Sequence, residues 1–307
     1  MQRYGKTAAG TQRYYCRSCH ISGIKSRTDI TQRHWKDIFV SWLCGEASER
    51  ELAQRFQVSR KTIYHHFRPF FQESYQCRFT TSQPIDFFLV DGKYIHKDSL
   101  CTLIALANTG DIFWEFASEE NGSTWQRMFA KLPTPVVVIC DGQKGLLRVI
   151  HILWPQAKIQ RCHFHMVSYG IQMLTRNPKT IAGKEILLFL HRLKDIHTHT
   201  EKEKWILLFR MWEKQYQKVL TEKNGQGAYV NKKLRSVRGL IKRAIPDLFT
   251  YLDYDVPNTT NLVEGWLNTR IADAIRQHRG FSPLHKKTLV SVLLSKLSKE
   301  KPTRKFT

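Results

Sequence analysis

The stretch Pro135-Val136-Val137-Val138-Ile139-Cys140-Asp141-Gly142 is an uninterrupted apolar run that ends in an aspartate and a glycine. A short run of this kind, rich in β-branched residues and bounded by turn residues, predicts a strand with both faces buried. Asp141 would then stand at the carboxyl end of that strand. The sequence on either side of the strand decides what kind of sheet it joins.

Three strands are predicted before this run, and short turns separate them. The first is again apolar and again ends in a carboxylate, Asp91. Consecutive strands with short connections predict an antiparallel meander, and the alternation of strand and helix that follows predicts a mixed sheet covered by helices. The predicted elements are strands over residues 86–91, 100–107, 112–117, 135–140 and 158–162, and helices over residues 123–132 and 146–153.

Two helices joined by a tight turn are predicted between residues 48 and 67. Ser48 and Glu51 form a capping box for the first helix, and Ser59 caps the second. This layout is typical of a helix-turn-helix, whose second helix meets DNA with its outer face. The alternative is an ordinary pair of antiparallel helices. The residues expected to contact the groove and its phosphates are Arg60, Lys61, Tyr64 and His65.

Charge points to the class of partner. The chain has 307 residues and a formal net charge of +23, which favours a polyanion such as nucleic acid. Residues 1–82 hold 14 basic and 6 acidic side chains, residues 176–307 hold 27 and 12, and residues 83–175 hold eight of each. A neutral middle between basic flanks favours acidic chemistry in the middle and phosphate binding on both sides. The alternative is charge that only serves solubility.

Neither a membrane protein nor a secreted protein is expected. The apolar runs are too short to span a bilayer, and residues 1–6 lack the apolar core of a signal peptide. Seven scattered cysteines do not form a disulfide framework, which favours a reducing cytosol.

Cys16 and Cys19 lie in a polar, basic segment, and two thiolates on one tight turn are half of a zinc ribbon. The usual arrangement places another C-x-x-C before this one, and residues 1–15 hold none. His20 offers a third ligand, and no fourth is evident. We therefore expect an incomplete zinc site, either because the sequence is shortened before Cys16 or because the site has decayed.

Residues 176–245 predict a region that is almost entirely helical. Trp205 and Trp212 recur there at helical spacing, for which core packing is the favoured role and stacking on a DNA end the alternative. A basic stretch of this region is either a solvated helix face or a contact with the DNA backbone. The residues of this stretch assigned to DNA are Lys232, Lys233, Arg235 and Arg238.

Glu264 lies at the start of a predicted helix, on a face that it shares with Asn261 and Asn268. Leu262 and Trp266 lie on another face, which we expect to pack inward. A buried glutamate needs a partner, and a metal ion is a suitable one. The alternative is a glutamate that faces solvent.

Asp91 and Asp141 would lie side by side if their two strands are neighbours. Two adjacent carboxylates repel each other unless a divalent cation joins them. With Glu264 as a third carboxylate they could hold two Mg²⁺ or Mn²⁺ ions, which activate water or a 3′-hydroxyl in phosphodiester chemistry. For either aspartate alone, the alternative is that it caps a loop.

The order of four short motifs resembles the DDE transposases of bacterial insertion sequences, on their Mutator-like branch. The motifs are Asp91-Gly92-Lys93, Asp141-Gly142, Arg161-Cys162-His163-Phe164-His165 and Asn258-Thr259-Thr260-Asn261-Leu262-Val263-Glu264-Gly265. The resemblance implies a mixed α+β and α/β fold, in which a helix-turn-helix precedes a ribonuclease-H-like mixed sheet with an all-α insertion. It also implies metal-dependent DNA cleavage and strand transfer by in-line attack, without a covalent protein intermediate.

By this resemblance Asp91, Asp141 and Glu264 are the catalytic metal ligands. Cys162 and His165 match a C-x-x-H element of the family, for which a structural or site-orienting role is favoured over a zinc site. The implied partners are the terminal repeats of the element, target DNA and further copies of the chain, on the nucleoid in the bacterial cytoplasm. The implied domains are a partial zinc-ribbon-like segment (1–27), a helix-turn-helix domain (28–77), a catalytic domain (85–175 and 246–300) and a helical insertion (176–245).

Two other functions stay open at this point. One is a helix-turn-helix regulator without catalysis, which accounts for the basic flanks but not for the acidic residues at the strand ends. The other is a nuclease of the same fold that cuts without strand transfer. Metal-dependent cleavage separates the regulator from the transposase, and analysis of the products separates the nuclease.

Overall fold

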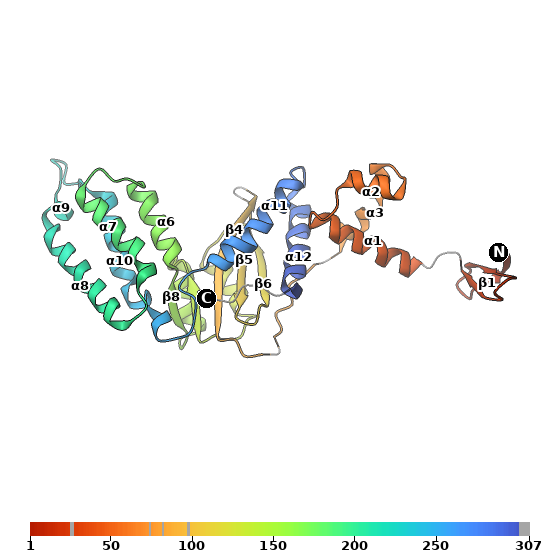
Figure 1. Cartoon of the computed structure of the whole chain (residues 1–307), viewed down its shortest axis with the longest axis horizontal. Coiled ribbons are helices and arrows are strands. Elements are labelled where there is room, and N and C mark those ends of the chain that lie inside the picture. The colour runs from red at the N-terminus through yellow and green to blue at the C-terminus, as the bar shows by residue number, and fades with distance from the viewer. Residues whose placement is uncertain (25–27, 74, 82, 97–98, 301–307) are drawn as a thin grey trace. The chain divides into compact units, whose positions relative to one another are not determined.

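The run Val137–Cys140 forms strand β7 of a five-stranded sheet (Figure 1). The protein is described by a computed structural model that covers residues 1–24, 28–73, 75–81, 83–96 and 99–300. The other strands of this sheet are β4 (Phe87–His96), β5 (Leu100–Ala107), β6 (Ile112–Ala117) and β8 (Lys158–Arg161). Each lies where the sequence predicts a strand.

The strands are arranged in the order β6-β5-β4-β7-β8. β4, β5 and β6 form an antiparallel meander, whereas β7 runs parallel to β4 and β8 runs parallel to β7. The predicted mixed sheet is therefore confirmed. β4 is the central strand, so residues near the end of its pairing with β7 lie at the middle of the sheet.

One predicted strand end is wrong. The sequence predicts that the first strand stops at Asp91, but β4 continues to His96. Asp91 lies within the strand and pairs with Ile104 of β5. The extension forms because β5 is long enough to pair with β4 as far as Leu100, while β7 stops pairing with β4 at Leu89.

Two helices cover one face of the sheet, α4 (Gly122–Phe129) and α5 (Lys144–Leu153). Trp125 and Phe129 of α4 and Ile150 of α5 are fully buried in one cluster with Phe88 of β4 and Val138 of β7. Burial of each such side chain contributes roughly 1.5–3 kcal/mol, so this layer anchors the central strands.

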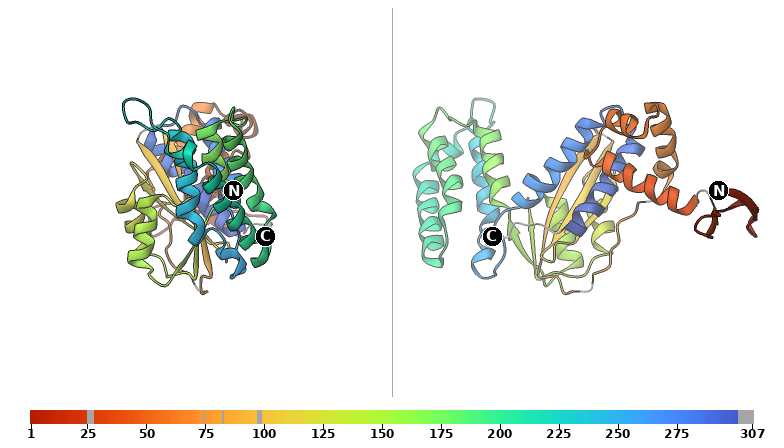
Figure 2. Two further views of the ribbon diagram at one scale, coloured as in Figure 1. Left: turned by 90° about the vertical axis from the view of Figure 1, so that its left-hand side faces the viewer. Right: turned by 45° about the vertical axis from the view of Figure 1, so that its right-hand side comes forward.

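A helical region follows β8. Its helices lie side by side as a bundle in both views of Figure 2, where they run from green to blue. Trp205 and Trp212 are buried in the core of this bundle, and Trp205 Nε1 donates a hydrogen bond to the Phe189 carbonyl at 3.0 Å. The favoured core role of both tryptophans is therefore confirmed. The helices are α6 (His163–Leu174), α7 (Ile181–His191), η2 (Arg192–Asp195), α8 (His199–Gln215), α9 (Gln217–Thr221) and α10 (Lys232–Ala244).

The chain returns from the bundle to the sheet through short helical turns. The segment around Glu264 is a π-helix, which has wider turns than an α-helix and is frequent at functional sites. These elements are η3 (Ile245–Asp247), η4 (Thr250–Leu252), η5 (the π-helix, Val263–Asn268), α11 (Thr269–Gln277) and α12 (Pro283–Glu300).

The chain divides into two compact units, Met1–Tyr75 with Arg276–Leu293, and Gln76–Ile275 with Leu294–Thr307. The elements described above belong to the second unit, except for the end of α11 and most of α12. Among the residues that the structure describes, no helix is long and apolar enough to cross a bilayer.

The first unit begins with a small antiparallel sheet and continues with short helices. In its helical part Phe39, Trp42, Phe67 and Phe71 form an aromatic core, against which Phe281 packs. The elements are β1 (Gln2–Lys6), β2 (Gln12–Tyr15), β3 (Ser22–Ile24), α1 (Thr28–Leu43), α2 (Glu49–Phe56), α3 (Arg60–Phe67) and η1 (Arg68–Gln72).

The predicted caps of α2 and α3 are confirmed. The Ser48 hydroxyl accepts a hydrogen bond from the Glu51 backbone N–H, and the Glu51 carboxylate accepts one from the Ser48 N–H. Ser59 caps α3 by accepting from the Thr62 N–H. Gln57, in the turn between the helices, adopts the left-handed conformation with φ of 53°.

Candidate active site

Asp91 and Asp141 lie at the same level of two neighbouring parallel strands. The paired residues Leu89 and Ile139 precede them by two positions on β4 and β7. The register therefore brings the two carboxylates to the middle of the sheet, where β4 continues and β7 ends.

The carboxylate of Asp91 is held from two sides. Asn268 Nδ2 of the π-helix donates a hydrogen bond of 2.7 Å to Asp91 Oδ2, and His165 Nε2 of α6 lies 4.0 Å from Oδ1. The pKa of Asp91 is raised to about 6, chiefly by burial and in smaller part by Glu264 and Asp141, against the opposing effects of His165 and Asn268. Burial is thus the main reason why the charged form of Asp91 is disfavoured, and the neighbouring carboxylates add to it.

Asp141 is positioned by its own turn. Its Oδ1 accepts a hydrogen bond of 2.9 Å from the Gln143 N–H, and its carbonyl accepts one of 2.8 Å from Nη2 of Arg161. Gly142 has φ of +78°, and a Cβ atom there would lie 1.8 Å from Nε of Arg161. A glycine is required because of both the backbone conformation and the close approach of the buried guanidinium.

Glu264 reaches the site from the π-helix. Its Oε1 accepts a hydrogen bond of 3.0 Å from the Thr260 hydroxyl and lies 3.4 Å from His165 Nδ1. His165 therefore stands between Glu264 and Asp91, which connects the π-helix, α6 and the central strand. Burial opposes the charged form of His165, but Cys162, Glu264 and Asp91 outweigh it and raise the pKa of His165 to about 9.

The predicted inward face of this helix is wrong. Val263 and Leu267 are fully buried, whereas Leu262 and Trp266 are only partly buried. The buried pair has the same spacing of four residues as the predicted pair, so spacing alone could not decide which pair faces inward. Asn268, at the end of the π-helix, is also buried and contacts Asp91.

Cys162 connects the start of α6 to the segment before Glu264. Its buried Sγ accepts a hydrogen bond of 3.2 Å from the Thr260 N–H, and the Thr260 hydroxyl lies 3.2 Å from the same sulfur. The His163 N–H also donates to the Asn258 carbonyl at 3.0 Å. These contacts are consistent with a site-orienting role for Cys162.

One set of three metal-capable groups is found among the described residues. It consists of Cys162, His165 and Glu264, whose ligand atoms lie within 4.8 Å of one another. Asp91 and Asp141 are not part of this set. The three carboxylates predicted as Mg²⁺ ligands thus lie around one site, but among the described residues they do not form a convergent set of this kind.

Sequence analysis missed two residues of this site, Asn268 as a partner of Asp91 and Glu120. Burial, together with the charges of Asp141 and Asp91, raises the pKa of Glu120 to about 7, against the opposing effects of Trp125 and His165. Glu120 therefore faces the same charged groups as Asp91. The sequence gives only a weak signal for Glu120: it lies in the polar turn after β6 and precedes Asn121, the N-cap of α4.

The residues predicted to bind DNA differ in their surroundings. All four on α3, namely Arg60, Lys61, Tyr64 and His65, are exposed. In the helical bundle, Lys232 and Lys233 are exposed. Arg235 instead lies over the Tyr229 ring at 3.5 Å and donates to the Leu220 carbonyl, and Arg238 pairs with Glu213.

Cys16 and Cys19 lie on the turn between β2 and β3. Hydrogen bonds from Cys19 lower the pKa of Cys16 to about 7, as is expected for two thiols on one tight turn. His20 Nδ1 lies 2.7 Å from the Tyr15 hydroxyl, so this ring nitrogen is already paired. Within the described parts of the chain, these thiols belong to no set of three metal-capable groups.

Comparison with known proteins supplies the family. The family model described as "Transposase, Mutator family" matches residues 109–299, which include Asp141, the Cys162–His165 element and Glu264. A comparison with curated proteins finds no relative that matches the chain.

Proposed function

Because the chain belongs to the Mutator family of transposases, we propose that it cleaves DNA at the ends of a mobile element and joins the freed ends to target DNA. The reaction is in-line attack on phosphodiester bonds at a DDE site formed by Asp91, Asp141 and Glu264. The observation that carries this proposal is that Asp91 and Asp141 lie opposite each other in the register of two neighbouring parallel strands, and that His165 lies between Asp91 and Glu264.

The residues present suit two hard divalent cations, Mg²⁺ or Mn²⁺. Carboxylate oxygens are the protein ligands that Mg²⁺ prefers. Asn268 Oδ1 is buried and has no hydrogen-bond partner among the described residues, although Nδ2 of the same side chain donates to Asp91. An unpaired buried oxygen beside a cluster of carboxylates favours a cation over an anion at this position.

The bound cations would activate the attacking water or 3′-hydroxyl and stabilise the leaving oxygen. The residues of the chain hold the site in shape. Arg161 fixes the turn that carries Asp141, and Cys162 and Thr260 fix the segment that carries Glu264. His165 orients Asp91 and Glu264 toward each other across the site.

Two further features support the finer parts of the proposal. The strand order β6-β5-β4-β7-β8, with an antiparallel first half, supports a ribonuclease-H-like sheet. The capped helices α2 and α3, joined by a tight turn and basic on the exposed face of α3, support a helix-turn-helix that binds the element ends. We further propose that copies of the chain assemble on the DNA.

The test is cleavage of DNA that carries the sequences flanking this reading frame, in Mg²⁺ or Mn²⁺. The wild-type chain is compared with Asp141→Asn, which keeps the oxygen that accepts from the Gln143 N–H. Asp253→Asn serves as the matched control, because Asp253 is exposed and belongs to a turn beyond the bundle. Cleavage should disappear only in Asp141→Asn, while binding of DNA persists in all three proteins.

The products decide between the remaining functions. Joined strands establish transfer, whereas cut DNA without joining identifies a nuclease. Equal cleavage by Asp141→Asn would contradict the carboxylate mechanism. DNA binding without any cleavage by the wild-type chain would favour a regulator.

A further inference from the structure

Glu120 lies in the loop between β6 and α4, and its carboxylate occupies the space above Gly92. A Cβ atom at position 92 would lie 2.2 Å from Oε2 and 2.8 Å from Oε1 of Glu120. Gly92 directly follows Asp91 on the central strand. The missing side chain at position 92 therefore makes room for a carboxylate immediately beside Asp91.

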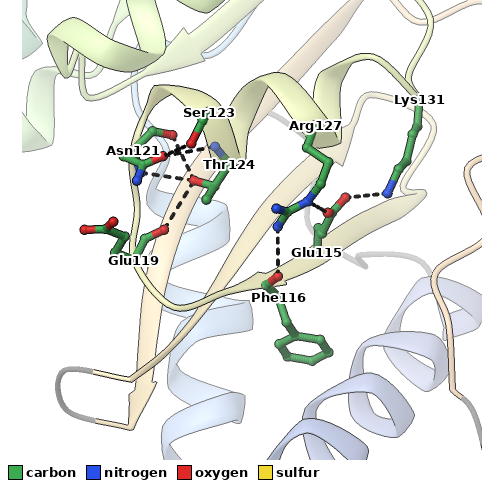
Figure 3. Close-up of polar contacts among 8 residues, drawn as sticks. All are labelled: Glu115, Phe116, Glu119, Asn121, Ser123, Thr124, Arg127 and Lys131. Atoms are coloured by element: carbon green, nitrogen blue, oxygen red, sulfur yellow. Dashed lines mark hydrogen bonds and ion pairs between the residues drawn. The ribbon is translucent and has the colours of Figure 1, made fainter.

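The loop that carries Glu120 is held firmly on both sides. Figure 3 shows Asn121 capping α4 through the Thr124 N–H at 3.1 Å, and the Thr124 hydroxyl reaching back to the Glu119 carbonyl at 3.2 Å. On the β6 side, Arg127 and Lys131 converge on Glu115. The position of Glu120 is thus fixed by the packing of α4 on the sheet.

Among the described residues, the hydrogen-bond partners of Glu120 are neutral groups. Trp125 Nε1 donates to Oε1 at 3.3 Å, and the Glu120 N–H donates to the Tyr94 hydroxyl at 3.3 Å. In the part of the chain that the structure describes, no lysine or arginine pairs with its carboxylate. Glu115, which lies on β6, has two basic partners.

A half-buried carboxylate beside two further carboxylates is unfavourable unless a cation offsets the repulsion. Among the described residues, His165 offsets part of the charge around Glu120. No lysine or arginine pairs with Glu120, although two basic side chains pair with Glu115. The buried, unpaired Oδ1 of Asn268 on the other side of Asp91 is an independent sign that this site takes a cation. One histidine faces several carboxylates here, so both observations indicate that the remaining positive charge comes from outside the chain.

We propose that Glu120 supplies a fourth carboxylate to the cation site of Asp91, Asp141 and Glu264, and that Gly92 is the residue that admits it. This inference rests on the function proposed above, because it adds a residue to the same site. Asp91 has a contact on each side. Glu120 lies against Gly92, the residue that follows Asp91, and Asn268 binds the carboxylate of Asp91.

The experiment measures binding of Mn²⁺ alone to the full chain by electron paramagnetic resonance, without DNA and without turnover. Glu120→Gln keeps an oxygen for Trp125 but removes the charge, and we expect the Mn²⁺ affinity to fall about 10-fold or more. The matched control is Glu119→Gln, because Glu119 is the exposed neighbour whose backbone carbonyl, not its carboxylate, holds the loop. It should bind Mn²⁺ as the wild type does.

A second variant tests the same contact from the other side. Gly92→Ala should weaken Mn²⁺ binding by pushing the Glu120 carboxylate aside, and it should cause no further loss when Glu120→Ala is already present. Melting curves without metal report whether each variant folds. If Gly92→Ala weakens binding equally with and without Glu120, the inference is overturned.

The outcomes separate this inference from the proposed function. Wild-type affinity in Glu120→Gln, together with lost affinity in Asp141→Asn, overturns the role of Glu120 and leaves the three-carboxylate site intact. Wild-type affinity in Asp141→Asn, or no Mn²⁺ binding by the wild-type chain, overturns both.

Discussion

Asn268 donates a 2.7 Å hydrogen bond to Asp91, and this contact joins the π-helix to the central strand of the sheet. The two residues lie far apart in the sequence, because the segment that forms the helical bundle stands between them in the chain. The same contact connects a residue that sequence analysis identified to one that it missed. A substitution at Asn268 can therefore test how an added negative charge beside Asp91 changes the stability of the protein.

Replacement of this amide by a carboxylate should destabilise the metal-free protein. Asn268→Asp exchanges a donor for a negative charge next to the buried Asp91, and we expect a loss of about 2 kcal/mol in the free energy of unfolding. Excess Mn²⁺ should restore part of the loss, because a cation offsets the added charge. Urea unfolding in chelator and in Mn²⁺ measures both effects. Equal stability of variant and wild type in chelator would contradict the importance of this contact.

Gly142 should tolerate substitution much less well than a glycine with the same backbone conformation in open space. Gly227 has φ of +77° and no atom within 4 Å of an added Cβ, so Gly227→Ala should cost only about 1 kcal/mol. Gly142→Ala adds a clash with Arg161 and should cost about 3 kcal/mol. The difference between the two urea midpoints measures the contact with Arg161. A difference near zero would show that the guanidinium moves away freely.

His163 should make the protein less stable in mild acid. Burial lowers the pKa of His163 from 6.5 to about 4, and its Nε2–H donates to the Leu248 carbonyl at 2.9 Å. The folded state therefore favours the neutral ring, so stability is full above about pH 6.5 and falls as the pH drops toward 4. Between pH 7 and pH 5 the loss from this residue should be about 2 kcal/mol.

The measurement compares urea unfolding of wild type and His163→Gln at these two pH values. Glutamine still offers an N–H to the Leu248 carbonyl but does not titrate. The acid-induced loss should be smaller in the variant by roughly the same 2 kcal/mol. An unchanged pH dependence would mean that His163 is protonated in the folded protein.

The exposed basic residues of α3 should contribute phosphate contacts. Arg60→Ala and Lys61→Ala should each lower the slope of log affinity against log salt concentration by about 1, with little change in sequence preference. Lys158→Ala is the control, because Lys158 is equally exposed but belongs to β8. Filter binding at several salt concentrations gives the slopes. A slope that stays unchanged in both α3 variants would place the DNA contact elsewhere.

Local pattern was sufficient to predict most of the secondary structure. The apolar runs around Val138 and Leu103 became central strands, and Ser48 and Ser59 became helix caps, because each depends on neighbours within a few residues. The approach of Asp91 to Asp141 was also predictable, since it needs only the assumption that their strands are adjacent.

The rest of the site depends on contacts that no local pattern contains. Glu120 stands in a polar turn, and its role becomes visible only through the space above Gly92. Leu262 and Trp266 were assigned to the inward face because they have the same four-residue spacing as the buried pair Val263 and Leu267, and spacing alone could not choose between the two pairs. Asp91 was predicted at a strand end because the run of apolar residues stops there. An apolar run shows which residues are buried, whereas the length of β4 is set by its pairing with β5.

The bundle α6–α10 stands in the chain between Asp141 and Glu264, and this order has a consequence during synthesis. A ribosome that adds roughly 5–20 residues per second exposes the strands with Asp91 and Asp141 on the order of ten seconds before Glu264. Thr260 and Asn268 also emerge only after the bundle. A nascent chain can therefore fold its sheet early, yet it gains all the carboxylates of the proposed site only after translation has passed the bundle, which would delay the proposed cutting of nearby DNA.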